Sequence, residues 1–176
     1  MNWRPVLGLC IVAAMGLALP TSSAVSQQKS LKEQLVGTWI PVAWDQQLPD
    51  GSKLQRFGAN PKGVNVFDAN GRFFVMFARA DLPRIASNNP MKTTSEEAQT
   101  ITAGTIAYYG TYTVDEANKT IAMKVETSTL PNQLGLDQKR VILALTADEL
   151  RYTNPTPLAG GTITVSLKRA PGPAVN

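Results

Sequence analysis

The segment Ile106-Ala107-Tyr108-Tyr109-Gly110-Thr111-Tyr112-Thr113-Val114-Asp115 decides the fold class. Its side chains alternate, so that Tyr108, Tyr112 and Val114 share one face and the threonines share the other. A period of two residues is typical of a β-strand that buries one face and exposes the other. The segment therefore predicts a half-buried strand.

Similar strand patterns recur along the chain. They are expected at 38–45, 63–67, 72–79 and 106–114, and then around 121–126, 141–145, 150–152 and 163–169. Asp68-Ala69-Asn70-Gly71 offers a hairpin turn between the second and third of these. About eight strands with mostly short connections predict an all-β fold, an eight-stranded antiparallel up-and-down barrel, because closure removes exposed edges. Such a barrel has room for one small ligand.

Two capping boxes predict short helices. Ser30 and Glu33 predict a helix over 31–36, and Thr94 and Glu97 predict one from Ser95 to about residue 103. The second helix follows a long loop, 80–91, and separates the third and fourth strands of the barrel. A loop and helix inserted there are expected to form a lid over one barrel end.

The strand 72–79 is apolar on both faces, because Phe73-Phe74-Val75-Met76-Phe77 are consecutive. Both faces should therefore be covered. One face is expected to meet the core, and the other a helix, a loop or a partner, which leaves both a monomer and a homodimer open.

Composition excludes several chemistries. The 176 residues contain one Cys and no His, so a Ser-His-Asp triad, a Cys-His pair and a His-ligated metal are ruled out. The formal charge of +4 is spread along the chain, which does not favour nucleic-acid binding. No spacing predicts a metal site of oxygen ligands, no catalytic residue is assigned, and no cofactor is expected.

The N-terminal residues are predicted to be a signal peptide over 1–24. Arg4 precedes an apolar run from Val6 to Leu19, and small residues follow up to Ala24. The run is too short to span a bilayer comfortably, so export to the periplasm or outside the cell is expected, without a stable membrane anchor after cleavage. Residues 25–34 are a linker and the start of the short helix, 35–170 the barrel domain and 171–176 a frayed tail.

The chain resembles the lipocalin-like domain family of small bacterial and fungal barrels. The matching pieces are Leu35-Val36-Gly37-Thr38-Trp39, Gly58-Ala59-Asn60-Pro61-Lys62-Gly63, Asp81-Leu82-Pro83-Arg84, residues 106–115, Pro131-Asn132 with Gly135, Gln138 and Arg140, and the closing strand to Arg169. The resemblance implies a calycin-type barrel with an internal cavity, but no single activity. Relatives often carry a His on the fifth strand near Met123-Lys124, and this chain has none there.

Ten residues are candidates to bind a ligand inside the barrel, set against ordinary roles in the core or at strand ends. They are Trp44, Phe73, Val75, Phe77, Arg79, Tyr108, Tyr112, Met123, Arg140 and Tyr152. A buried Tyr hydroxyl needs a polar partner, and an Arg at the barrel mouth can hold a carboxylate or enolate. Which way Arg140 faces is open, because Ile142 competes with Val141 and Leu143 for the inside.

Two further residues are expected to be structural. Trp39 has the position of the lipocalin tryptophan at the closed barrel end, and Arg169 on the last strand can stack on its indole.

The favoured function is an exported protein that binds a small apolar or amphipathic molecule inside the barrel, without chemistry. A cyclase or isomerase that uses the cavity, with Tyr or Arg stabilising developing charge, is the alternative. A barrel filled by its own side chains is the third possibility.

Overall fold

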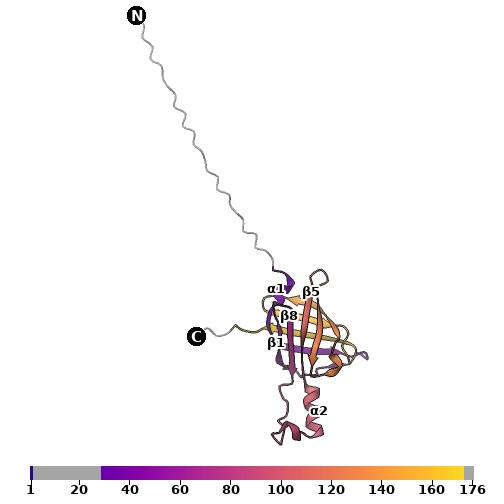
Figure 1. Ribbon diagram of the computed structural model, residues 1–176. Coiled ribbons are helices and arrows are strands. Elements are labelled where there is room, and N and C mark those ends of the chain that lie inside the picture. The colour runs from indigo at the N-terminus through magenta and orange to yellow at the C-terminus, as the bar shows by residue number, and fades with distance from the viewer. Residues whose placement is uncertain (2–28, 173–176) are drawn as a thin grey trace.

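A computed structural model describes Met1 and residues 29–172, and eight of its strands close into one antiparallel barrel (Figure 1). Apart from Met1, the predicted signal peptide with Cys10 lies outside the described residues, as do residues 173–176 of the predicted tail. The strands are β1 (Gly37–Gln47), β2 (Lys53–Leu54), β3 (Lys62–Phe67), β4 (Arg72–Ala78), β5 (Thr105–Asp115), β6 (Thr120–Ser128), β7 (Asp137–Leu145), β8 (Glu149–Asn154) and β9 (Thr162–Arg169). The helices are α1 (Leu31–Leu35) and α2 (Ser95–Gly104), with 3-10 turns η1 (Pro90–Lys92) and η2 (Pro131–Gln133).

The barrel follows the predicted up-and-down order. Strands β3 to β9 pair consecutively, and β1 pairs with both β3 and β9, which closes the sheet. The pairing of β1 with β9 shifts register between Pro41 and Ala43, so the proline sits at the bulge that its missing N–H requires. The two-residue β2, which the sequence did not predict, pairs with the end of β1. The eight-stranded antiparallel barrel is confirmed.

Two glycines allow neighbouring strands to approach closely. A Cβ atom on Gly63 would lie 1.9 Å from the carbonyl oxygen of Met76, and one on Gly110 would lie 1.9 Å from that of Lys124. Gly63 also has φ +142°, a backbone conformation that other residues rarely adopt. Any side chain at these positions would push adjacent strands apart.

One end of the barrel is sealed by α1. The predicted capping box is present, with the Ser30 and Glu33 side chains each accepting from the other's backbone N–H. The Glu116 carboxylate, in the β5–β6 turn, accepts from the N–H groups of Leu31 and Lys32 at 2.8 and 3.1 Å. Leu35 of the helix and Trp39 of β1 are fully buried, so this end is closed and a cavity inside the barrel must open at the other end.

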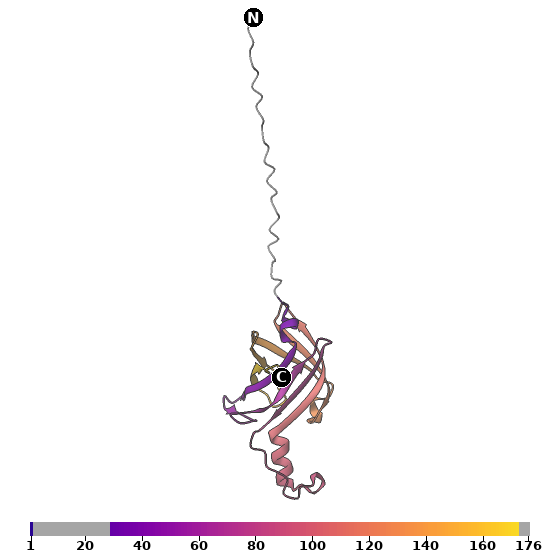
Figure 2. The same ribbon diagram turned by 90° about the vertical axis from the view of Figure 1, so that its left-hand side faces the viewer.

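The second helix is where the sequence predicts it, but it does not form a lid. In both views α2 extends away from the barrel end beyond β4 and β5 (Figures 1 and 2). Arg56 anchors its end by donating to the carbonyl oxygens of Ala103 at 2.7 Å and of Thr102 and Thr105 at 3.1 Å each. These bonds satisfy carbonyls at the C-terminus of the helix, which otherwise lack partners.

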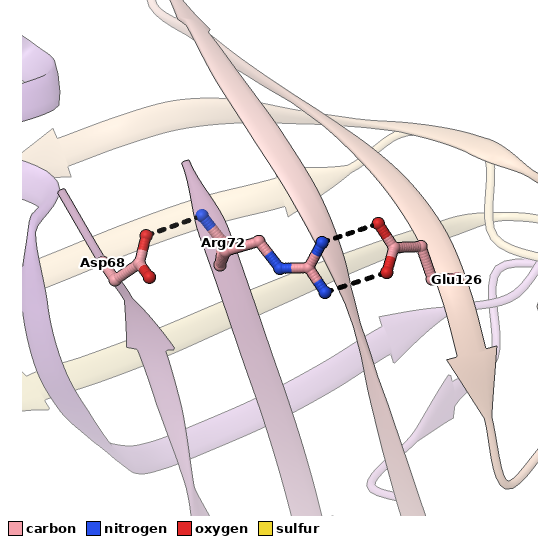
Figure 3. A network of polar contacts seen from close by, with 3 residues as sticks. All are labelled: Asp68, Arg72 and Glu126. Carbon is pink, nitrogen blue, oxygen red and sulfur yellow. Dashed lines mark hydrogen bonds and ion pairs between the residues drawn. The ribbon is translucent and has the colours of Figure 1, made fainter. Parts of the chain in front are cut away.

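The second apolar face of β4 is partly exposed, so its predicted cover by a partner stays a prediction. Phe74 and Met76 are each 38% exposed, and Tyr109 on β5, opposite Phe74, is 40% exposed. Within residues 29–172 no helix or loop covers them. Beside them Arg72 makes two hydrogen bonds of 2.8 Å to Glu126 across β5, and the Asp68 carboxylate accepts from the Arg72 N–H at 2.7 Å (Figure 3).

Candidate functional site

A cavity of about 400 Å³ lies at the end of the barrel opposite α1. It is bounded by the ends of β1 and β4, the starts of β5, β7 and β9, the end of β8, and the loops between them. No residue between 79 and 105 lines it, so the insertion that carries α2 stands outside the site. The volume is within the range of small-molecule pockets.

Aromatic rings form one wall of the cavity. Trp44 and Phe57 meet edge to face with centroids 5.1 Å apart, and Phe57 stacks on Phe77 at 5.4 Å. Phe57 comes from the β2–β3 connection and is only 1% exposed, so this connection contributes to the interior. The Arg56 guanidinium lies 5.1 Å from the Phe57 ring centroid. Arg56 therefore supports this wall as well as α2.

Polar groups form the inner part of the cavity around Arg140, which is 4% exposed. Its guanidinium donates to the side-chain oxygen of Gln138, to the Lys139 carbonyl at 3.1 Å and to the Tyr108 hydroxyl at 3.4 Å. It also lies 6.0 Å from the ring centroid of Tyr152. A guanidinium offers five N–H donors, so this group can bind further acceptors.

The Tyr152 hydroxyl is held from the other side by Asn65. The Asn65 side-chain amide donates to it at 3.0 Å, and Asn65 is fully buried with its own carbonyl oxygen unpaired within the described protein. Burial, and then the nearby Tyr108, raise the pKa of Tyr152 well above its usual value. The phenol therefore stays protonated at neutral pH, where it can donate a hydrogen bond.

The charges around this site are unbalanced. The ion pairs of the described residues are Arg72 with Glu126 and Arg79 with Asp81, both on the outside of the barrel. Arg140 has no carboxylate partner among residues 29–172. The lining contains one acid, Asp137, which is exposed at the mouth.

The structure brings half of the predicted binding residues to the cavity. The lining includes Trp44, Phe77, Tyr108, Arg140 and Tyr152. Arg140 faces inward with Ile142, whereas Leu143 is 48% exposed, which resolves the orientation that the sequence left open. These five side chains therefore lie together around one cavity, and their contact with a ligand stays a prediction.

The prediction is wrong for the position of the other five residues, because none of them lines the cavity. Phe73, Val75 and Met123 are buried deeper in the core, at 3% exposure or less. The Tyr112 hydroxyl donates to the Asp68 carbonyl at 2.6 Å, in the hairpin near the closed end. Arg79 turns outward and pairs with Asp81 at 2.7 Å, since that acid is two residues away.

The remaining two predicted residues lie together at the closed end. The Arg169 guanidinium carbon is 4.0 Å from the Trp39 ring centroid. The same side chain donates to the carbonyl of Val36 at 3.1 Å, to that of Gln34 at 2.7 Å and to that of Ala147.

Several lining residues were not predicted. Gln46, Gln138 and Asn154 each lie two positions from a predicted residue on the same strand. Because alternate residues of a strand share a face, Gln46 and Asn154 could have been predicted from Trp44 and Tyr152. Phe57 carries no such signal, because it lies in a connection without periodicity.

The comparison with family models supports the barrel assignment. A family model described as a lipocalin-like domain matches residues 36–164. A redesigned β-barrel is 15% identical with a TM-score of 0.43, and a de novo designed fluorescence-activating β-barrel is 12% identical with the same score. Each alignment covers 81% of this chain and 100% of the other. No curated protein matches the chain.

Two other features are absent from the described residues. Residues 29–172 contain no helix long and apolar enough to cross a membrane. The same part of the chain holds no group of three acidic, Cys or His side chains placed to bind a metal ion.

Proposed function

This protein belongs to the lipocalin-like domain family, and we propose that its barrel binds one small amphipathic molecule in the cavity at the open end. The observation that carries the proposal is the cavity itself, with an aromatic wall and a buried polar cluster in one space of about 400 Å³. Apolar walls with a few convergent polar groups are typical of small-molecule sites. We also propose that the protein acts after export, on the basis of residues 1–24.

The cavity suits a ligand with two chemically different parts. Trp44, Phe57 and Phe77 offer apolar surface, and each methylene buried there contributes about 0.8 kcal/mol. Arg140 and Tyr152 offer hydrogen bonds inside the barrel. A fully apolar molecule would leave these polar groups without ligand contacts. A barrel filled by its own side chains does not fit this open end.

Filling the cavity tests the proposal. Val165 on β9 is 2% exposed and lines the cavity, so Val165→Trp should occupy part of the space. We expect affinity for Nile red, a neutral fluorescent ligand, to fall at least about fivefold, because the ligand and the indole compete for one volume. Val42→Trp on β1 is the matched control, since Val42 is 51% exposed. Equal Nile red affinity in the wild type and both variants would contradict a binding cavity.

Native mass spectrometry of the purified full chain provides a second measurement. A small molecule retained by the wild type and lost from Val165→Trp, but kept by Val42→Trp, would identify the natural ligand. Chemical conversion of the retained molecule during incubation would instead favour the alternative function, catalysis. That alternative draws on the convergence of Arg140 and Tyr108, whose N–H and O–H groups are placed to stabilise negative charge on a bound oxygen.

A further inference from the structure

We infer that the ligand carries a carboxylate, which Arg140 binds at the inner end of the cavity while the apolar part of the ligand extends towards the mouth. This inference rests on the proposed function and adds the chemical class and the orientation of the ligand.

The first step is the environment of Arg140. All three of its hydrogen-bond acceptors are neutral, namely the Gln138 amide oxygen, the Lys139 carbonyl and the Tyr108 hydroxyl. A buried guanidinium is costly unless an opposite charge compensates it. Within residues 29–172 no carboxylate pairs with it, whereas Arg72 and Arg79 on the surface both have one. A carboxylate on the ligand would supply the missing charge in the two-pronged geometry that a guanidinium favours.

The second step is the charge of the whole lining. It contains two guanidinium groups, Arg140 and Arg56, against the single acid Asp137 at the mouth. An anionic ligand is therefore favoured over a cationic one. The Tyr152 hydroxyl, close to Arg140, adds a hydrogen-bond donor, because the phenol stays protonated.

The third step is the distribution of apolar surface, which gives the orientation. Arg140 is 4% exposed, and its guanidinium contacts the buried side chains of Tyr108 and Tyr152, so the cation lies inside the barrel. The mouth carries Leu54, Leu136 and Leu158, which are 43%, 38% and 54% exposed. Exposed leucines around a cavity mark a surface that an apolar group can cover. The carboxylate therefore enters first, and the tail contacts this rim.

The test compares three ligands of one chain length on the full wild-type chain by isothermal titration calorimetry. They are decanoate, 1-decanol and decyltrimethylammonium, which carry an anionic, a neutral and a cationic head. We expect decanoate to bind at least about tenfold more tightly than decanol, and the cation to bind most weakly.

Variants assign the effect to Arg140. Arg140→Met should lower decanoate affinity at least about tenfold and leave decanol affinity within about twofold, since only the charge-assisted bonds are lost. Arg140→Lys should retain part of the preference for decanoate, because the charge remains but the two-pronged geometry does not. Arg79→Met is the matched control, because that guanidinium lies outside the cavity, and it should bind all three ligands as the wild type does.

The outcomes separate this inference from the proposed function. Equal binding of decanoate and decanol by the wild type would overturn the carboxylate assignment and leave a binding cavity standing. A decanoate preference that survives in Arg140→Met would overturn the role of Arg140. Failure of all three ligands and of Nile red would overturn both proposals. If Arg140→Met does not fold, the wild-type ligand series still tests the carboxylate assignment, and Arg140→Lys still tests the role of Arg140.

Discussion

Arg169 does more for the closed end of the barrel than any single contact suggests. Its guanidinium stacks on Trp39 at 4.0 Å and donates to three backbone carbonyls, two of which belong to the α1 region. Gly37 beside this guanidinium has φ +139°, a backbone conformation that other residues rarely adopt, so glycine is favoured there. One side chain thus joins the last strand, the first strand and the helix.

Removing that guanidinium should destabilise the fold. We expect Arg169→Met to lower the free energy of unfolding by about 2 kcal/mol, because charge-assisted hydrogen bonds and a cation–π contact are lost together. Urea denaturation followed by circular dichroism measures the change. Lys168→Met, next in the chain but exposed, should change it by less than about 0.5 kcal/mol. Equal losses in the two variants would contradict the role given to Arg169.

Tyr152 should make the fold sensitive to alkaline pH. Burial raises its pKa in the folded protein above the unfolded value of about 10, with Tyr108 adding to the rise and Arg140 and Asn65 opposing it. Above pH 10 the unfolded chain therefore loses a proton that the folded chain keeps. Unfolding becomes more favourable as pH rises, and stability falls by up to about 1.4 kcal/mol per pH unit from this group.

Stability measured from pH 9 to 11.5 checks this expectation. The free energy of unfolding should fall less steeply with pH in Tyr152→Phe than in the wild type, whatever the difference in stability between the two proteins at pH 9. Tyr109→Phe, on the exposed outer face of β5, should keep the wild-type slope. A parallel decline in all three proteins would show that Tyr152 does not cause the pH dependence.

At the scale of elements, the β2–β3 connection links the cavity to α2. Phe57 forms part of the aromatic wall, and the adjacent Arg56 holds the C-terminal carbonyls of the helix. The helix extends away from the barrel (Figure 2), and its Glu97 carboxylate accepts from the Ala86 N–H of the same insertion at 2.8 Å.

Arg56→Met should therefore loosen α2 without unfolding the barrel. We expect the amides of residues 98–104 to exchange with deuterium at least about threefold faster, because the last turn of the helix loses its side-chain cap. Amides of β5 and β6 should keep their wild-type rates. Arg84→Met, an exposed position in the same insertion, is the control. Unchanged exchange in α2 would contradict the anchoring role of Arg56.

Periodicity predicted the strands well, because each long strand buries alternate side chains. It failed where structure depends on distant residues. Arg56 contacts carbonyls more than forty positions away, so the direction of α2 could not be predicted from its capping box. A register shift between Ile142 and Ala144 disturbs the alternation in β7. The sequence pattern therefore could not show whether the Arg140 side chain faces the inside of the barrel. The cavity polar residues Gln46 and Asn154 were missed because the alternation was applied to apolar and charged side chains.

At the scale of the whole molecule, the barrel divides into two ends with different tasks. The end beneath α1 is filled by buried side chains such as Trp39 and Leu167, while the other end keeps a cavity. Burial of apolar side chains is the dominant favourable contribution to folding, and a wall that faces a cavity makes fewer packing contacts. Stability should therefore depend on the closed end, and ligand affinity on the open end.

Two substitutions on β9 separate these tasks. Leu167 is 1% exposed at the closed end, so Leu167→Ala should cost about 2–5 kcal/mol of unfolding free energy. Ile163 lines the cavity and is partly exposed, so Ile163→Ala should cost about 1 kcal/mol of unfolding free energy, because it enlarges a space that already exists.

Ligand binding should respond in the opposite order. Ile163→Ala should weaken Nile red binding about threefold. Leu167→Ala, in conditions where the variant remains folded, should leave Nile red affinity within about twofold of the wild-type value. Urea denaturation and fluorescence titration measure the two quantities on the same samples. If both variants lost stability and affinity in the same proportion, the barrel would behave as one undivided core, and the assignment of separate tasks to its ends would be wrong.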